Sequence, residues 1–236
     1  MTSHGAGRLE GRGILITGAS RGIGAAAARA AVVAGARVAL LARDASAIAT
    51  LAREIGAGRA DSAIAIPCDV RDPEAVDRAI EHAASVLGGI DSAVLSHGVN
   101  RLGPIASLSD ADWNEVIATN LTGSFHVARA LSPRLTNGIV FVASVSALDA
   151  FEKFPGFAAY CASKRGLLGL AEVMAVELEP RGVRVHSVCP RGVDTGMFRS
   201  TFPGAAADHT PGDVARRILD HLDSATAPPS GSVTQL

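Results

Sequence analysis

The feature that most restricts the fold is a regular alternation of short apolar runs with segments that have helical spacing. Six apolar runs of strand length are found at residues 13–17, 37–42, 62–70, 91–98, 138–144 and 182–190. The segments between them are long enough for helices, and the longest helix is predicted over residues 109–133. Strands that alternate with helices form right-handed βαβ units. The pattern therefore predicts an α/β fold, in which a doubly wound parallel sheet is flanked by helices on both faces.

One domain is expected over residues 1–236, because the length suits one domain and neither a repeat nor a linker divides the chain. Apolar residues make up 48% of the sequence, which is enough to bury a sizeable core. The alternating pattern occupies about residues 10–197, and residues 222–236 are predicted to form a short, loop-like tail that ends in an edge strand.

Composition argues against several classes of partner. The net charge is −1 and no basic run occurs, so no nucleic-acid partner is expected. No window reaches the ~18 uncharged apolar residues that a membrane span needs. The three cysteines, Cys68, Cys161 and Cys189, lack the spacing of a metal or redox site. Their small, odd number predicts reduced thiols, no bound metal and a cytoplasmic location.

A cluster of glycines separates the first predicted strand from the first predicted helix. Gly18, Gly22 and Gly24 lie in the sequence ITGASRGIG, with the spacing G-x-x-x-G-x-G. A tight turn at this place directs the free N–H groups of a helix N-terminus at a pyrophosphate. Positions without a side chain let the phosphates approach the backbone. The glycines therefore predict a dinucleotide-binding Rossmann fold, although their spacing differs from the general G-x-G-x-x-G pattern.

The only tyrosine of the chain, Tyr160, stands four residues before Lys164, one of two lysines. Side chains four apart on a helix share one face, with roughly 5–6 Å between their Cβ atoms. The charge of the lysine then lies near the phenol and is expected to lower its pKa from about 10. Such a phenol can deliver a proton to a ketone oxygen during hydride reduction. The alternative is a surface tyrosine beside a solvated lysine.

Four motifs together resemble the short-chain dehydrogenase/reductase family over residues 10–197. They are TGASRGIG, NLTG, a serine that ends the fifth predicted strand, and YCASK. The resemblance implies that Tyr160 is the catalytic acid and that Lys164 lowers its pKa and binds the nicotinamide ribose. It implies that Ser144 hydrogen-bonds the substrate oxygen and that Asn120 holds a water linking Lys164 to solvent.

Two of these assignments have alternatives. Ser146 competes with Ser144, because residues two apart face the same side of a strand. Asn120 could instead kink the helix or pack in its interior.

The resemblance also implies which residues contact the cofactor. They come from the glycine loop and from the ends of later strands: Gly18, Ser20, Arg21, Gly22, Ile23, Gly24, Arg43, Asp69, Val70, Gly98, Tyr160, Lys164, Pro190, Val193 and Thr195. In the family, Asp69 would contact the adenine, Val193 the nicotinamide amide and Thr195 the pyrophosphate region.

The expected cofactor is NADP(H) rather than NAD(H). Arg21 and Arg43 stand where members that prefer NADPH carry basic residues, and Ala42 stands where NAD-dependent members carry an acid. Asp44 lies about where a ribose-binding acid is expected, but we interpret it as the start of the next loop. The alternative is that both arginines are solvated surface charges.

Two positions depart from the family pattern. Leu95-Ser96-His97-Gly98 replaces the usual Asn-Asn-Ala-Gly. Ser96 could supply part of the lost hydrogen bonding, and His97 is interpreted as structural, with a cofactor or substrate contact as the alternative. Arg191 replaces a glycine, and it either turns to solvent or reaches a phosphate or an anionic substrate.

Five of the seven phenylalanines lie in the two segments expected to enclose a substrate, residues 145–159 and the predicted mobile lid 196–210. They favour an apolar ketone, diketone or alcohol as the small-molecule substrate. The alternatives are a 3-oxoacyl-thioester reductase and a non-catalytic nucleotide-binding regulatory protein. A homodimer or homotetramer is expected, with the dimer formed through the helices that hold Asn120 and Tyr160.

Overall fold

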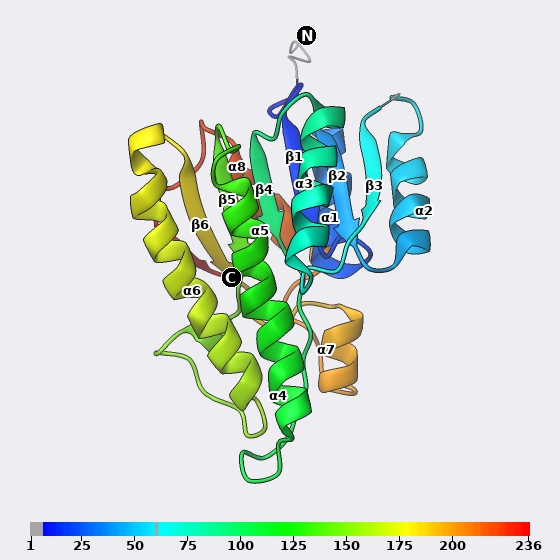
Figure 1. Cartoon of the computed structure of the whole chain (residues 1–236). Coiled ribbons are helices and arrows are strands. Elements are labelled where there is room, and N and C mark those ends of the chain that lie inside the picture. Colours follow the sequence, from blue (N-terminus) through cyan, green and yellow to red (C-terminus); the bar gives the residue numbers. More distant parts are fainter. Residues whose placement is uncertain (1–6, 60) are drawn as a thin grey trace.

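The computed structural model describes residues 7–59 and 61–236 and places a parallel sheet at the centre of the molecule (Figure 1). The strands are β1 (Gly13–Thr17), β2 (Arg37–Ala42), β3 (Ala63–Pro67), β4 (Ser92–Leu95), β5 (Gly138–Val142), β6 (Arg184–Cys189) and β7 (Val233–Gln235). Their order is β3-β2-β1-β4-β5-β6-β7, and every neighbouring pair is parallel. The predicted α/β sheet is confirmed. Residues 1–6 of the predicted domain lie outside the described residues.

Helices cover both faces of this sheet, as predicted (Figure 1). They are α1 (Gly22–Val33), α2 (Ala45–Gly56), α3 (Pro73–Leu87), α4 (Asp110–Ile117), α5 (Gly123–Leu131), α6 (Ala158–Leu178), α7 (Gly196–Thr201) and α8 (Pro211–Leu222). One buried cluster joins α3, α5 and α6 to the sheet, and a second joins α1, α2 and α8 to its other face.

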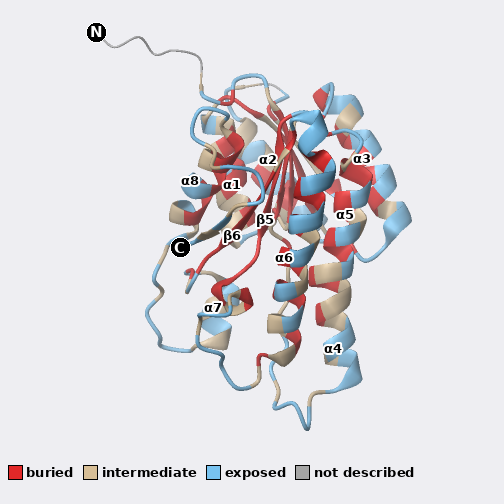
Figure 2. Ribbon diagram, turned by 90° about the vertical axis from the view of Figure 1, so that its left-hand side faces the viewer, coloured by how far each residue is buried: buried red, intermediate tan, exposed pale blue. Residues whose placement is uncertain are grey.

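The central strands are apolar on both sides because both sides are covered. All five residues of β1 and all five of β5 are buried. Leu15 and Phe141 face the cluster with α3, α5 and α6, and Ile16 and Val140 face the opposite cluster. Figure 2 shows the central strands as buried, whereas the outer sides of the helices are exposed. Unbroken aliphatic runs of this kind are typical of parallel sheets.

Local signals in the sequence set several helix ends. Thr210 and Asp213 form a reciprocal capping box at the start of α8, and Pro211 occupies its first position. Asp72 caps α3, whose first residue is Pro73. Gly35 follows α1 with a φ of 96°, a left-handed conformation that favours glycine. These helix ends are thus set by residues close in sequence.

Two segments differ from expectation. The predicted helix 109–133 is interrupted by a π-helical turn, Ala118–Thr122, between α4 and α5. Such turns are often found at functional sites, and apolar spacing does not predict them. Residues 196–210 are not all loop, because α7 forms at their start with Thr195 as its N-cap. The tail ends in the edge strand β7, as expected.

Candidate active site

A cleft of about 1250 Å³ opens at the carboxyl ends of the strands. It lies where the strand order reverses between β1 and β4, the usual binding place in open α/β sheets. Every cofactor-contact residue named from the sequence lines it except Gly24, and every proposed catalytic residue lines it except Asn120. Both exceptions are buried directly beneath the cleft wall.

The glycine loop has the geometry that an anionic pyrophosphate needs. Gly18 has a φ of 65°, and an added Cβ would lie 2.7 Å from the main chain of His97. An added Cβ at Gly24 would lie 2.4 Å from the Gly18 carbonyl oxygen. The N-cap of α1, Arg21, makes no side-chain capping hydrogen bond, so the first N–H groups of α1 remain available to a ligand. The loop therefore fits the phosphates of a dinucleotide.

Basic side chains line the adenosine part of the cleft. Arg21 and Arg43 both line it, close to Asp44. The Asp44 carboxylate caps α2 by accepting hydrogen bonds from Ala47 N at 3.0 Å and Ser46 Oγ at 2.8 Å. These hydrogen bonds hold the pKa of Asp44 below its ordinary value. Asp44 thus begins the next element, as interpreted, although that element is a helix rather than a loop.

Asp69, at the end of β3, has a partner that sequence reasoning missed. Arg71 donates to both oxygens of its carboxylate, with Nη2 to Oδ2 at 2.6 Å. This side-chain pairing lowers the pKa of Asp69. An adenine contact at Asp69 would therefore be made by a carboxylate that is already held in place by Arg71.

Ser144, Tyr160 and Lys164 meet at the other end of the cleft. Helix α6 carries Tyr160 and Lys164, and the Lys164 Nζ lies 5.8 Å from the centre of the phenol ring. The Lys164 ammonium donates to the Val142 carbonyl at 2.8 Å. Ser144 follows β5, lines the same cleft as the Tyr160 phenol and acts to lower its pKa. Ser146 lies one contact further away, with its Oγ 3.2 Å from the Ser144 Oγ, so the geometry favours Ser144 over Ser146.

Burial shifts the two titratable groups in opposite directions. It raises the pKa of Tyr160 to about 12, against a smaller lowering by the Ser144 hydrogen bond. It lowers the pKa of Lys164 to about 8. The expectation that the lysine charge makes the phenol more acidic is therefore not met in this structure. Desolvation by burial is the largest cause of the Tyr160 shift, and the Lys164 ammonium, which lies over the ring, donates to a main-chain carbonyl.

Asn120 lies in the π-turn and its side chain is fully hydrogen-bonded. The amide oxygen accepts from Val99 N at 2.8 Å, and the amide nitrogen donates to Val99 O and to Ser163 Oγ, both at 3.0 Å. The side chain thus joins the segment after β4 to α6. These hydrogen bonds give the Asn120 side chain the packing role that the sequence left open. A separate role for the Asn120 main chain is compatible with them.

The comparisons with known proteins agree with this geometry. A family model described as short chain dehydrogenase matches residues 12–206. The chain belongs to the short-chain dehydrogenase/reductase family. It is 38% identical over 205 residues to D-threitol dehydrogenase of Mycolicibacterium smegmatis, covering 85% of this chain and 77% of that protein.

Two solved structures of the family also resemble this chain closely. A short chain dehydrogenase from Burkholderia cenocepacia in complex with NADP is 29% identical, with a TM-score of 0.88 and 97% of each chain covered. A 3-ketoacyl-(acyl-carrier-protein) reductase from Brucella melitensis complexed with NADH is 26% identical, with a TM-score of 0.87 and 97% of each chain covered. This short-chain dehydrogenase is therefore an NAD(P)-dependent oxidoreductase.

Within the described ranges, no helix is long and apolar enough to cross a membrane.

In the segment after β4, where this chain departs from the family motif, the side chains of Ser96 and His97 are both hydrogen-bonded. Ser96 Oγ donates to the Thr17 carbonyl at 2.8 Å, which supplies the hydrogen bond expected of it. His97 is buried, with Nδ1 2.6 Å from Thr17 Oγ1 and Nε2 3.1 Å from Ser124 Oγ. Burial lowers the pKa of His97 to about 3, so the ring is neutral. Sequence reasoning singled out His97 but missed both of its partners, which lie 80 and 27 residues away.

The substrate end of this short-chain dehydrogenase is walled by aromatic rings. Phe157 stacks on Phe202 with 5.8 Å between ring centres, and its edge meets the Tyr160 ring at 6.2 Å. Arg191 turns towards this end, where its guanidinium lies 5.4 Å from the centre of the Phe151 ring. Its Nε is 3.6 Å from Asp208.

Proposed function

We propose that this short-chain dehydrogenase is an NADPH-dependent carbonyl reductase that acts on apolar ketones or diketones. The observation that carries the proposal is the position of the Tyr160 phenol. It is buried beside Ser144 in the same cleft that holds the glycine loop and two arginines.

The chain's own groups can manage the proton and the developing negative charge. A bound nicotinamide supplies the hydride. With a pKa of about 12, Tyr160 keeps its proton at neutral pH and can donate it to the carbonyl oxygen. Ser144 can donate to the same oxygen, where a hydrogen bond is worth most as charge develops. Oxidation of an alcohol uses the same groups but needs the phenolate, so it should become faster as the pH rises towards 12.

The preference for NADPH is supported by the charges around the adenosine end. Among the residues that the structure describes, neither Arg21 nor Arg43 is in an ion pair with a carboxylate. Asp44, the nearby acid that could select a free ribose, already caps α2. Two cations with no fixed partner favour a phosphate on the ribose.

The aromatic wall supports an apolar substrate. A 3-oxoacyl-thioester on an acyl carrier would favour a basic entrance, but Arg191 and Arg199 already face Asp208 and Asp194. A polyol such as threitol would leave the phenylalanine rings without apolar contacts. Both classes nevertheless belong in the test, because relatives of these kinds resemble the chain.

The non-catalytic alternative rested on the departures at Leu95, Ser96 and Arg191. Two contacts speak against this alternative: Ser96 supplies a hydrogen bond to β1, and Arg191 lies beside Phe151 and Asp208 in the cleft wall. A protein that only bound the nucleotide would have no need of a buried phenol beside a serine.

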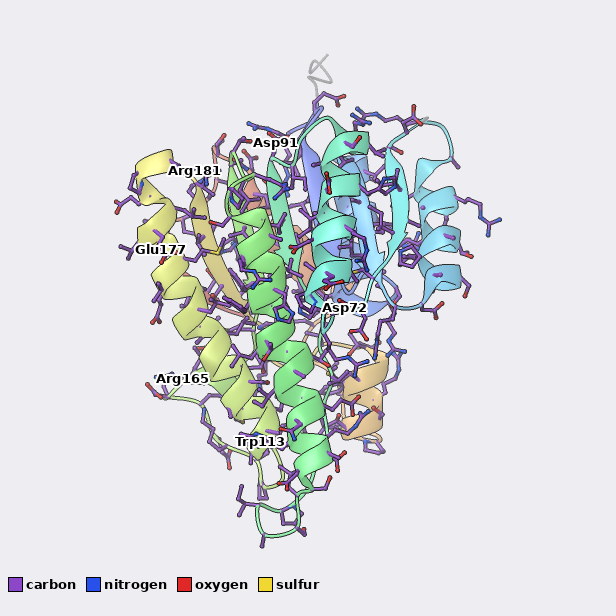
Figure 3. The ribbon with its side chains drawn as sticks, viewed as in Figure 1. Asp72, Asp91, Trp113, Arg165, Glu177 and Arg181 are labelled. Atoms are coloured by element: carbon purple, nitrogen blue, oxygen red, sulfur yellow. The ribbon has the colours of Figure 1, made fainter. Side chains whose placement is uncertain are left out.

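The proposed assembly is a homo-oligomer formed through α4, α5 and α6. These helices expose Trp113, Phe125, Val173 and Val176, and Figure 3 labels Trp113 beside α4 and α6. Exposed apolar side chains on these helices suit a contact between copies. A cytoplasmic location is proposed because Cys68, Cys161 and Cys189 are free thiols.

The decisive experiment measures NADPH consumption by the purified protein. The panel contains aromatic and aliphatic ketones, diketones, an acyl thioester and, with NADP⁺, threitol. We expect the fastest turnover with the aromatic ketones. A protein that binds NADPH but oxidises it with none of these carbonyl compounds would contradict the proposal and favour the binding protein.

A further inference from the structure

We propose that His97 is a positioning residue, which fixes the main chain at Asn120 through a one-directional chain of hydrogen bonds that begins at Thr17 in β1. The chain runs from Thr17 to His97, from His97 to Ser124 and from Ser124 to Asn120. The proposal concerns the same site as the proposed function and uses its turnover as one readout. It also has a readout that needs no substrate.

Every member of this chain is buried. Thr17 and Asn120 are fully buried, Ser124 is 2% exposed, and His97 is 9% exposed. The contacts are Thr17 Oγ1 to His97 Nδ1 at 2.6 Å, His97 Nε2 to Ser124 Oγ at 3.1 Å, and Ser124 Oγ to Asn120 O at 2.7 Å. Buried polar groups with few alternatives adopt one arrangement, because an unmade hydrogen bond is costly there.

The hydrogen atoms can be assigned from the acceptors. The Asn120 carbonyl only accepts, so the hydroxyl hydrogen of Ser124 is used in donating to it. Ser124 Oγ must therefore accept from His97, which places the imidazole proton on Nε2. Burial lowers the pKa of His97 to about 3, so the ring is neutral and carries one proton. Nδ1 is then the unprotonated nitrogen and accepts from the Thr17 hydroxyl at 2.6 Å, whose other acceptor, the Val94 carbonyl, is further away at 3.5 Å.

This assignment connects the sheet to the π-turn. His97 follows β4, whereas Thr119 and Asn120 lie in the π-turn and Ser124 lies in the first turn of α5. A neutral histidine with a proton on Nε2 holds these two segments together. With the other tautomer, Thr17 would have to turn its hydrogen from His97 to the Val94 carbonyl at 3.5 Å, and a lone pair of Ser124 would face the lone pair of Nε2.

The reacting groups lie directly beside this connection. A Cβ added to Gly98, the residue after His97, would lie 3.4 Å from Asn120 Oδ1 and 3.7 Å from Lys164 Nζ. Val99, the next residue, makes two hydrogen bonds with the Asn120 amide. A shift of the His97 ring would thus move the wall that Lys164 faces. No contact between His97 and the Tyr160 phenol is needed for this effect.

Two substitutions of His97 test its two ring nitrogens, Nε2 and Nδ1, separately. The amide nitrogen of glutamine reaches about as far as Nε2, so His97→Gln can still donate to Ser124. The amide oxygen of asparagine reaches only as far as Nδ1, so His97→Asn can accept from Thr17 but leaves Ser124 without a donor. We expect His97→Gln to keep kcat within about threefold, whereas His97→Asn loses about tenfold to 100-fold with an unchanged Kd for NADPH. Ser124→Ala should lower kcat as His97→Asn does. The double variant His97→Asn, Ser124→Ala should lose no more kcat than the worse of the two single variants.

The control is Ser92→Ala, which removes a buried hydroxyl that accepts from Asn137 at 2.9 Å at the far end of β4. It should lower the thermal midpoint and leave kcat unchanged. Equal losses of kcat and of thermal midpoint in His97→Gln and His97→Asn would show that the ring only packs, and would overturn the proposal.

The substrate-free readout is the tautomer of His97 in the wild-type protein. Nitrogen-15 spectra of the histidine rings at pH 7 should contain a neutral, Nε2-protonated ring whose signals disappear in His97→Gln. An Nδ1-protonated or doubly protonated His97 would overturn the proposal, even if every substrate of the panel is turned over. If His97 has the expected tautomer but the protein reduces no carbonyl compound, only the proposed function is contradicted.

Discussion

At the scale of the residue, the site is governed by how strongly burial acts on Tyr160 and Lys164. Both side chains leave water, and each is shifted towards its neutral form. A neutral phenol suits proton donation, but a buried ammonium costs stability at neutral pH. The nucleotide-free protein is therefore expected to lose stability by burying Lys164. Its ammonium donates to a main-chain carbonyl, and no carboxylate among the described residues pairs with it.

Replacement of Lys164 by methionine should stabilise the nucleotide-free protein. The pKa of Lys164 is about 8 in the fold, against about 10.4 for a lysine in an unfolded chain. The unfolded chain binds more protons between these values, so the stability of the wild type should rise from about pH 8 to pH 10. At pH 7 we expect Lys164→Met to gain about 2 kcal/mol, after the loss of the hydrogen bond to Val142 is subtracted.

Denaturant unfolding from pH 6 to pH 10 measures this effect, and Lys153→Met, on the exposed loop before α6, is the matched control. The control should show neither the gain at pH 7 nor the altered pH dependence. A Lys164→Met protein that is less stable than the wild type at pH 7 would show that its charge is stabilised by groups other than those described.

Arg43 should distinguish NADPH from NADH. Replacement by alanine removes one of two cations that line the adenosine end, so the Kd for NADPH should rise about tenfold and the Kd for NADH less than about twofold. Arg53→Ala is the control, because Arg53 lies on α2 and bonds to its own helix at Ala49 and Thr50. Fluorescence titration gives both constants, and equal losses for the two nucleotides would remove the phosphate contact.

At the scale of the element, the sequence predicts what depends on local pattern and misses what depends on distant partners. The strands of the sheet follow from aliphatic runs, and the start of α8 follows from Thr210 and Pro211. The π-turn around Asn120 does not follow, because it is held from outside by Val99 and Ser163. The raised pKa of Tyr160 does not follow either, since the spacing to Lys164 gives the distance between two charges but not their burial.

The glycine turn provides the element-scale prediction. At Gly24 a methyl group would meet the Gly18 carbonyl at 2.4 Å and Ser96 Oγ at 2.5 Å, so Gly24→Ala must push α1 away from β1 and β4. We expect a loss of about 2–4 kcal/mol in unfolding free energy and weaker NADPH binding. Gly212→Ala, in the first turn of α8 with its nearest atom at 3.6 Å, should be neutral or slightly stabilising.

Denaturant unfolding and a nucleotide titration of both variants check this prediction. If Gly24→Ala kept the stability and the affinity of the wild type, the turn would not require a residue without a side chain.

At the scale of the whole molecule, the two faces of the sheet have different outer surfaces. The side covered by α1 and α8 exposes few large apolar side chains, whereas α4, α5 and α6 expose several. Val173 and Val176 on α6 are 59% and 71% exposed. Burial of these side chains against a second copy would contribute the hydrophobic free energy that a monomer leaves unused.

Charges placed on α6 should separate the copies. Sedimentation of the double variant Val173→Asp, Val176→Asp should give a monomer at concentrations where the wild type is dimeric or larger, because two carboxylates per copy would have to be buried. Val33→Asp, on α1 at the opposite face, is the control and should leave the assembly unchanged. A wild-type protein that is already monomeric would contradict the proposed interface.

The central claim is that the Tyr160 phenol delivers the proton that completes carbonyl reduction. The most direct measurement compares the rate of NADPH oxidation by the wild type and by Tyr160→Phe, with the best ketone of the panel and saturating nucleotide. We predict that the substitution lowers the rate by at least about 100-fold and changes the Kd for NADPH by less than about threefold. A Tyr160→Phe protein that binds NADPH normally and keeps more than about a tenth of the wild-type rate would contradict the claim.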